Sequence, residues 1–259
     1  MYNSQDDFNA IARRNYSVEI GRFINRGWEI FSRNAAGFIG FCVLTFVISI
    51  VLSSIPGMGG IVNGIVSSVL TAGYYIVAFK IAKQQTVEFG DFFRGFQNSY
   101  FLPVFLASFV SSLFIFMLVL PLGAGLFLSF YPLFRSMALK QGEDIQDLPE
   151  LELPTTLGMP LLVIGVILLL GAIYLGVAYS FTLPLVIDRR ARFWTAMETS
   201  RRLISSHWFE FFFFTFVLGL INFGGALACG VGLIFTLPLT ICAIAAAYED
   251  IVGLSINDF

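Results

Sequence analysis

The chain has 259 residues, of which 57% are hydrophobic and only 12% are charged, and its formal net charge is −2. Soluble globular domains carry about a quarter charged residues, so a chain this apolar is expected to use the lipid bilayer as its solvent. Its slightly acidic balance excludes the basic stripe that nucleic-acid binding needs, and we expect no nucleic-acid partner.

Residues 1–16 are polar and are expected to form a flexible N-terminal arm. The first 34 residues hold no short apolar core with a small-residue cleavage site, so we expect no cleavable signal peptide and an uncleaved first anchor. Ser17 is a suitable N-cap for the helix that follows, and Glu19 lies in its first turn, where the helix dipole favours an acid.

The residues that follow Ser17 have the spacing of an amphipathic helix. Its apolar side chains share one face: Ile20, Phe23, Ile24, Trp28 and Phe31. The other face is polar and carries Arg22, Asn25, Arg26, Glu29 and Arg33. Such a helix is expected to lie in the membrane interface rather than to cross the membrane.

Residues 35–55 and 61–82 each supply about the 20 apolar residues that cross a bilayer core, and a charge-free, glycine-rich turn joins them. A second interfacial helix is predicted at residues 88–99 from the spacing of Phe89, Phe92, Phe93, Phe96 and Tyr100. The string Arg94-Gly95-Phe96 in this segment echoes Arg26-Gly27-Trp28 in the first.

The apolar stretch 101–134 is too long for one span, because a straight helix of that length reaches roughly 50 Å against a core of about 30 Å. Pro121 and Gly123 offer a place to stop, so we predict that the span ends near Leu122. A further interfacial helix is predicted after it, on the face of Leu126, Phe130, Leu133 and Met137. The loop 141–158 carries acids without calcium-loop spacing, and we interpret it as solvated.

A fourth span is predicted at residues 159–187 and the last two at 210–229 and 231–248. Between them lies a third amphipathic segment, with Phe193, Met197, Ile204 and Trp208 on one side. Glu198 and Arg202 form an i, i+4 pair on its polar side.

The predicted fold is an all-α integral membrane protein with six transmembrane helices in three hairpins, each preceded by a cytoplasmic amphipathic interfacial helix. A single membrane domain, residues 17–250, is expected to contain repeats at about 17–83, 88–188 and 190–250. The second repeat holds an extracytoplasmic insertion at 123–158, and a short tail, 251–259, ends the chain.

The distribution of Lys and Arg residues predicts the orientation of the chain in the membrane. Thirteen of the 15 Lys and Arg residues lie before residue 34, within 80–94 or within 189–202. Because cytoplasmic loops carry the excess of positive charge, both termini and all three amphipathic helices are predicted to be cytoplasmic and the acidic loop external.

Few residues in the sequence are candidates for catalysis or for binding a metal or a substrate. Cys42, Cys229 and Cys242 lie in apolar runs and are interpreted as buried hydrophobic residues, and His207 beside Trp208 as an interface anchor. Candidate polar contacts inside the membrane are Asn63, Ser67 and Asn222, which we expect to form hydrogen bonds between helices rather than to bind a substrate. Small residues spaced four apart are expected to let helices approach closely: Gly60/Gly64, Ala172/Gly176 and Gly224/Ala228.

Arginines beside aromatic residues are candidates for contact with lipid phosphates or an acidic partner, since a planar guanidinium can donate two parallel hydrogen bonds to phosphate oxygens. These residues are Arg26, Trp28, Arg94, Phe96, Arg201, Arg202 and Trp208. The alternative is that the arginines only enforce orientation. The expected partners are membrane lipids, and either a membrane-protein partner or a second copy of the chain; no catalytic residue, metal or cofactor is expected.

The strings FTLPLVID (181–188), FWTAMETSRRLISSHW (193–208) and CGVGLIFTLPL (229–239), with Tyr248-Glu249-Asp250, resemble a group of uncharacterised bacterial six-helix membrane proteins. That group is similar to the membrane domain of some glycerophosphodiester phosphodiesterases. The resemblance implies a multi-pass protein of the bacterial cytoplasmic (inner) membrane without the catalytic half of those enzymes, and the insertion at 123–158 departs from its compact pattern.

The sequence therefore leaves two candidate functions. The first is a non-enzymatic protein that organises or stabilises the bilayer or a membrane complex through its basic amphipathic helices. The alternative is a carrier or channel for a lipid-like or small neutral solute, since repeats occur in transporters and the absence of midplane charge argues against ion coupling. An enzyme is not expected, because no acid, base and nucleophile are grouped in the sequence.

Overall fold

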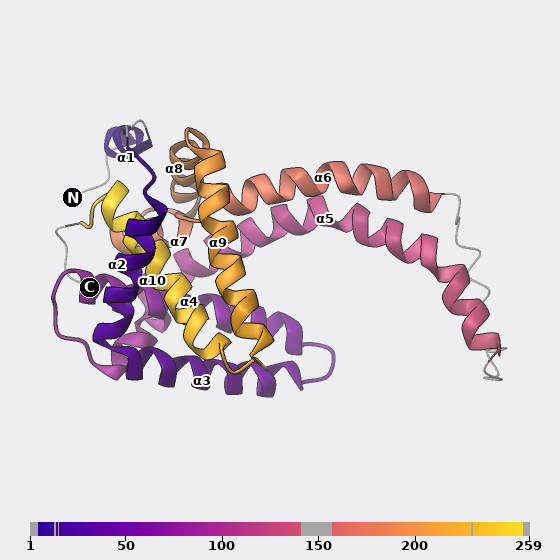
Figure 1. Ribbon diagram of the computed structural model, residues 1–259, viewed down its shortest axis with the longest axis horizontal. Helices are drawn as coiled ribbons and strands as arrows, with labels where there is room; N and C mark the ends of the chain where they lie inside the picture. Colours follow the sequence, from indigo (N-terminus) through magenta and orange to yellow (C-terminus); the bar gives the residue numbers. More distant parts are fainter. Residues whose placement is uncertain (1–4, 13, 15, 141–156, 229, 256–259) are drawn as a thin grey trace. The chain divides into compact units, whose positions relative to one another are not determined.

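A computed structural model of the protein describes residues 5–12, 14, 16–140, 157–228 and 230–255. Every regular element in these ranges is a helix (Figure 1). The helices are α1 (Gln5–Ala12), α2 (Ile20–Arg33), α3 (Ala35–Ser53), α4 (Gly59–Ala82), the 3₁₀ helix η1 (Phe89–Phe96), α5 (Asn98–Lys140), α6 (Gly158–Ala178), α7 (Thr182–Arg189), α8 (Phe193–Ser205), α9 (Trp208–Leu227) and α10 (Leu233–Ile251).

Six helical segments in the described part of the chain are long and apolar enough to cross a membrane. They are α3, α4, the first 34 residues of α5, α6 together with α7, α9 and α10. This composition indicates a multi-pass membrane protein, since each segment supplies the roughly 20 apolar residues that a bilayer core requires.

The chain divides into two compact units. Unit 1 contains residues 1–111 and 177–259, and unit 2 contains residues 112–176. In unit 1 the central element is α4, in which every residue from Val69 to Ile81 except Thr71 is buried. A helix that is apolar and buried all round lies inside a bundle, so α4 is the axis about which unit 1 is packed.

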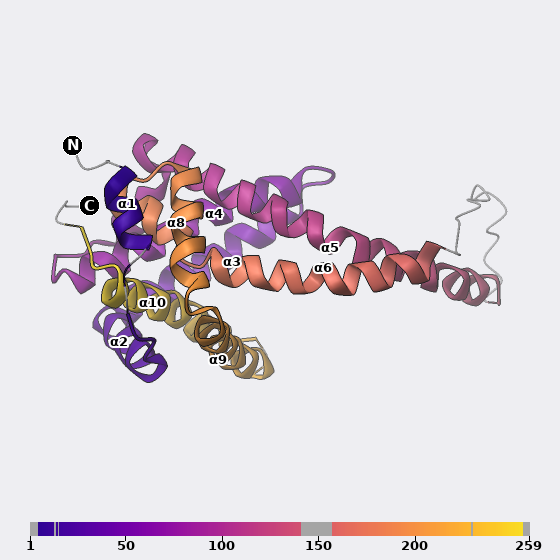
Figure 2. The ribbon, with the colours of Figure 1, turned by 90° about the horizontal axis from the view of Figure 1, so that it is seen from above.

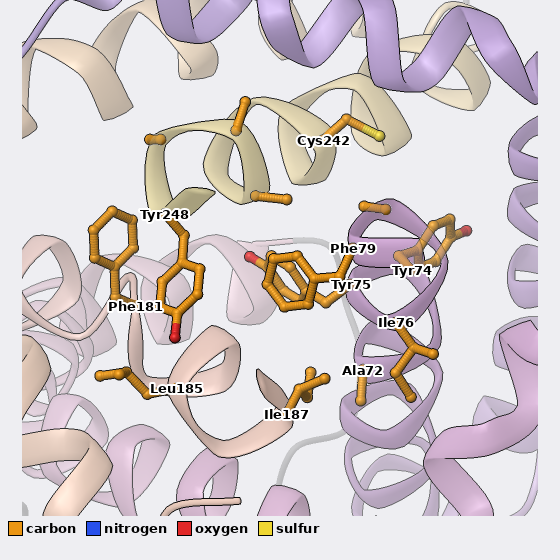
Figure 3. Close-up of a cluster of buried hydrophobic side chains, with 14 of the residues drawn as sticks. Ala72, Tyr74, Tyr75, Ile76, Phe79, Phe181, Leu185, Ile187, Cys242 and Tyr248 are labelled. Atoms are coloured by element: carbon orange, nitrogen blue, oxygen red, sulfur yellow. The ribbon is translucent and has the colours of Figure 1, made fainter. Parts of the chain in front are cut away.

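Aromatic side chains form much of the core around α4. Tyr248 of α10 lies between Phe181 and Phe79, with ring centroids 5.6 and 5.5 Å away (Figure 3). Because Phe79 and Tyr248 both lie in the last turns of their helices, the carboxyl-terminal ends of α4 and α10 meet at the same end of unit 1.

Unit 2 is formed by parts of α5 and α6 that run side by side in opposite directions (Figures 1 and 2). A Cβ added at Gly125 would come within 2.6 Å of the backbone of Leu162, and one at Gly165 within 2.4 Å of Leu122. The prediction that the third span ends near Leu122 is therefore wrong. The helix continues through Pro121 to Lys140, because packing along α6 outweighs the one backbone hydrogen bond that the proline removes. The separate interfacial helix predicted beyond Leu122 is part of α5.

The predicted fourth span is broken into α6 and α7 at Tyr179–Phe181. The fully buried Ser200 of α8 bridges the break: its hydroxyl accepts a hydrogen bond from the Phe181 N–H at 3.1 Å and donates one to the Ala178 carbonyl at 2.7 Å. A side chain far along the sequence thus satisfies backbone groups that the interrupted helix leaves unpaired.

The N-terminal region contains α1, a helix that the sequence analysis did not predict. Phe8 of α1 is buried, and the Tyr16 hydroxyl donates a hydrogen bond of 2.8 Å to the Leu203 carbonyl in α8. Ser17 is not the N-cap of α2, because the helix begins one residue after Glu19 and no side chain caps it.

The glycines in close contact are not those that the four-residue spacing suggested. A Cβ at Gly60, Gly64, Gly176 or Gly224 would meet no atom within 4 Å, so these residues face open space in this chain. A Cβ at Gly27 of α2, in contrast, would lie 2.6 Å from the Cα of Ala243 in α10.

The acids of the loop 141–156, predicted to be external, lie outside the described residues.

Candidate functional site

The arginines and aromatic residues predicted to contact lipids or a partner lie at one end of unit 1, which we call the polar end. It consists of α2, η1, α7 and α8 with the carboxyl-terminal ends of α4 and α10. Ion pairs and hydrogen bonds connect these elements across long sequence separations, as between Arg26 and Glu249 and between Asp188 and Tyr248. The polar end is therefore built from every repeat that the sequence predicted.

Helix α2 is attached to the end of α10 by two arginines. Arg26 binds both carboxylate oxygens of Glu249, with Nε and Nη2 at 3.1 and 3.0 Å, and its Nη1 donates to Glu29 at 3.0 Å. Arg22 pairs with Asp250. These hydrogen bonds, first of all that to Glu249, raise the pKa of Arg26, which therefore remains a cation.

A groove of about 710 Å³ lies between α2 and α10. We call it the α2–α10 groove, and its polar lining consists of Arg22, Asn25, Arg26, Glu29, Glu249 and Asp250. Trp28, on the same helix, is 56% exposed rather than packed in the core, where Phe23, Ile30 and Phe31 are buried. The inner side of α2 thus holds the bundle, and its outer side presents an indole and charged groups.

The 3₁₀ helix η1 is fixed to α4 by a buried ion pair. Lys80 donates to Asp91 at 2.6 Å, and Arg94 pairs with the other carboxylate oxygen at 2.7 Å. Burial raises the pKa of Asp91, but the hydrogen bonds from Lys80 and the Glu88 N–H outweigh it and hold that pKa below its usual value. Charged partners that satisfy each other make such burial tolerable.

Part of the aromatic face predicted for η1 points inward. Phe92 is fully buried and packs on Phe38 and Phe41 of α3, with ring centroids 5.5 and 4.6 Å away. Phe96 is 41% exposed and Phe89 is also exposed. The prediction that Phe92 faces the membrane interface is therefore wrong, whereas Phe96 is accessible next to Arg94.

Arg201 and Arg202 share one acid. Glu198 accepts hydrogen bonds from Arg201 at 2.9 and 2.8 Å and from Arg202 at 2.6 Å, which confirms the predicted Glu198–Arg202 pair. The hydrogen bond from Arg201, with a smaller contribution from Arg202, lowers the pKa of Glu198 to about 2 against the opposing effect of burial. Their contact with lipid phosphates stays a prediction.

The apolar residues of α8 and α9 likewise include both buried and exposed side chains. Met197 and Ile204 are buried, whereas Trp194, which the sequence analysis did not single out, is 58% exposed. Trp208 stacks on Phe212 at 5.2 Å and is half-buried. His207, predicted to be an interface anchor, lies 3.1 Å from Glu210.

An extended network surrounds Asp188, which sequence reasoning also missed. Its fully buried carboxylate accepts hydrogen bonds from the Tyr248 hydroxyl at 3.0 Å and the Ser255 N–H at 2.9 Å, and it pairs with Arg189 at 3.1 Å. Arg190 follows in a left-handed conformation and lies over the Tyr100 ring at 3.9 Å. The available signal was an acid next to two arginines directly after an apolar span.

The polar residues expected inside the membrane form hydrogen bonds within hairpins. Asn63 donates to Ser53 at 3.3 Å, Asn222 donates to Thr240 at 2.9 Å, and Ser67 donates to the carbonyl of Gly64 in its own helix. The bonds of Asn63 and Asn222 join two helices, whereas Ser67 does not form the bond between helices that the sequence predicted. The amide oxygens of Asn63 and Asn222 are buried without a hydrogen-bond partner.

The remaining candidates for chemistry give no reaction centre within the described ranges. Cys42 and Cys242 are buried as expected, and Cys229 lies outside the described residues. His, Cys, Asp and Glu side chains do not gather in groups of three or more that could hold a metal ion in the part of the chain that the structure describes.

No protein-family model, curated protein or solved structure matches the chain.

Proposed function

We propose that this protein is a non-enzymatic membrane protein that organises or stabilises the bilayer, or a membrane complex, through the three short helices α2, η1 and α8. The three hairpins of the predicted repeat then serve as the anchor, with the short helices and both termini in the cytoplasm. The proposal places the protein in the bacterial inner membrane, on the strength of its motifs and their resemblance to the six-helix group.

One observation carries this proposal. Each short helix has an inner side packed in the bundle and carries both an exposed aromatic residue and an arginine: Trp28 and Arg26 in α2, Phe96 and Arg94 in η1, and Trp194 and Arg202 in α8. Tryptophan and arginine together are typical of the boundary between lipid headgroups and acyl chains. Exposed aromatic residues and arginines at one end of a bundle are suited to holding lipids or a partner helix.

The ion pairs of the polar end support the non-enzymatic assignment. Arg26, Arg94, Arg201 and Arg202 each have a carboxylate partner: the pair of Arg26 with Glu249 joins α2 to α10, and the other pairs lie within η1 or α8. Each keeps a side-chain exposure of about a third or more and can also contact a phosphate. The same groups can therefore stabilise the bundle and hold a lipid.

The test is the phospholipid that remains after purification in mild detergent. The triple variant Trp28→Ser/Phe96→Ser/Trp194→Ser should retain less phospholipid, or less of a stoichiometric partner, per mole of protein. The triple variant with Leu at the same positions is the control, because it keeps the apolar surface. Equal retention by the wild type and both variants would contradict the proposal.

The alternative is a carrier or channel for a lipid-like or small neutral solute. The unpaired, buried amide oxygens of Asn63 and Asn222 favour it, because a solute could hydrogen-bond to them. Solute flux in proteoliposomes that falls on substitution of both asparagines by Leu would support the carrier over the organising role.

A further inference from the structure

We propose that the α2–α10 groove binds the headgroup of an amine-bearing zwitterionic phospholipid, of which phosphatidylethanolamine is the simplest. Its ammonium group would lie against Glu249 and Asp250, and its phosphate against Arg22 and Arg26. This inference rests on the proposed function, since it names the lipid class that one of the three short helices holds.

The net charge of the groove lining favours the binding of a cationic group. Its lining has two arginines, Arg22 and Arg26, and three carboxylates, Glu29, Glu249 and Asp250, which leaves one negative charge in excess. Arg22 pairs with Asp250, and Arg26 pairs with both Glu29 and Glu249, so the excess negative charge lies on the side of Arg26. An ammonium group offsets the negative charge locally at the carboxylates, and the phosphate of the same headgroup lies against the arginines.

The position of the acids in α10 strengthens this argument. Glu249 and Asp250 lie in the last turn of α10, which contains no basic residue. The carboxyl-terminal end of a helix carries a partial negative charge, so two acids there repel the helix dipole as well as each other. A ligand cation at this place relieves both repulsions, and the two arginines of α2 relieve them only in part.

The arginines keep donors for a phosphate. A guanidinium has five N–H donors in a planar fork, and Arg26 uses Nε and one N–H from each terminal nitrogen for Glu249 and Glu29. Two N–H donors of Arg26 remain, and Arg22 lies one helical turn away on α2. A phosphate diester with one negative charge fits beside these cations.

The location favours a lipid over a soluble amine. The groove lies where a membrane-spanning segment, Leu233–Ile251, ends, and its base is formed by Phe23 and Ala246. Trp28 is exposed on the same helix, and tryptophan is enriched at the level of lipid headgroups. A headgroup at that depth reaches the groove without leaving the bilayer.

The experiment compares phospholipids that differ only in the headgroup. The full-length protein in mild detergent is titrated with phosphatidylethanolamine, phosphatidylcholine or phosphatidylglycerol, and bound lipid is counted by native mass spectrometry. Phosphatidylethanolamine should bind about tenfold more tightly than phosphatidylcholine, because its ammonium donates hydrogen bonds to carboxylates and a quaternary amine does not. Soluble phosphoethanolamine should compete only weakly.

Asp250→Asn and Glu249→Gln should each remove this preference. Glu198→Gln is the matched control, since Glu198 is also an acid paired with two arginines but lies on α8, away from the groove. The comparison of lipids on the wild type decides the matter even if a variant does not fold.

Three outcomes would overturn the inference. Equal binding of phosphatidylethanolamine and phosphatidylcholine would show that the amine is not recognised. Preferred binding of phosphatidylglycerol would leave the proposed function standing and assign the groove to anionic lipid. Competition by soluble phosphoethanolamine at the same concentration as the lipid would assign it to a soluble ligand. A protein that retains no lipid or partner would contradict the proposed function itself.

Discussion

Buried polar side chains at the polar end act as connectors between elements. Asp188 joins α7 to α10 and to the tail through Tyr248 and Ser255, and Ser200 of α8 joins α6 to α7. An unpaired polar group in such surroundings costs far more than a made hydrogen bond gains. Single substitutions here should therefore affect stability more than their small volume suggests.

Ser200→Ala should lower the stability of the folded protein by about 1–3 kcal/mol, because the Phe181 N–H and the Ala178 carbonyl lose their shared partner. Thermal unfolding in detergent measures the change. Ser32→Ala is the control, since the exposed Ser32 donates to the Glu29 carbonyl within its own helix, α2, and it should change stability by about 0.5 kcal/mol at most. Equal effects of the two substitutions would contradict the bridging role.

The Glu198 cluster should make stability depend on pH in the acid range. The arginines lower the pKa of Glu198 from its ordinary 4.5 to about 2 in the folded state. The stabilisation is thus fully present above about pH 4.5 and is lost as the pH falls toward 2. The melting temperature of the wild type should exceed that of Glu198→Gln at pH 6, and the difference should shrink between pH 4.5 and 2. A difference that does not depend on pH would rule this contribution out.

At the scale of elements, the short helices are held by close backbone approach as well as by charge. A Cβ at Gly73 of α4 would overlap the carbonyl oxygen of Phe92 in η1, and one at Gly95 of η1 would lie 2.4 Å from the carbonyl oxygen of Val69. Glycine is required at both places because any larger residue would separate η1 from α4. These contacts keep η1 against α4 and not free in the interface.

Gly27→Ala should destabilise the contact between α2 and α10, since its Cβ would lie 2.6 Å from the Cα of Ala243. The expected cost is about 1–3 kcal/mol, as for other overpacked sites. Gly21→Ala, in the same helix and with no atom within 4 Å of the added Cβ, should instead stabilise the protein by about 0.5–1 kcal/mol. Unfolding curves of the two variants that shift in the same direction would refute this assignment.

At the scale of the whole molecule, the distribution of cations predicts both termini in the cytoplasm. A cysteine-free background carrying Ala10→Cys or Asp147→Cys tests this by labelling intact cells with a membrane-impermeant maleimide. Position 10 is exposed on α1, and position 147 belongs to the acidic loop outside the described residues. The label should modify position 147 and spare position 10. Labelling of position 10 from outside would reverse the orientation.

The sequence by itself determined the helical class and the number and approximate place of the spans. Long apolar stretches are recognisable because a bilayer core sets a minimum length, and the predicted spans at 35–55 and 61–82 agree with α3 and α4 within a few residues. The local pair of Glu198 and Arg202 was also predictable, because helical geometry brings residues four apart together.

Only the tertiary structure decided where helices continue, break and touch. Helix α5 passes Pro121 because α6 packs along it, and the fourth span breaks at Tyr179–Phe181, where Ser200 satisfies the backbone. The glycines in close contact, such as Gly27, and the partners of the arginines, such as Glu249, depend on which helix lies opposite. That choice is set by contacts between residues far apart in the chain, and a pattern with a period of a few residues does not contain them.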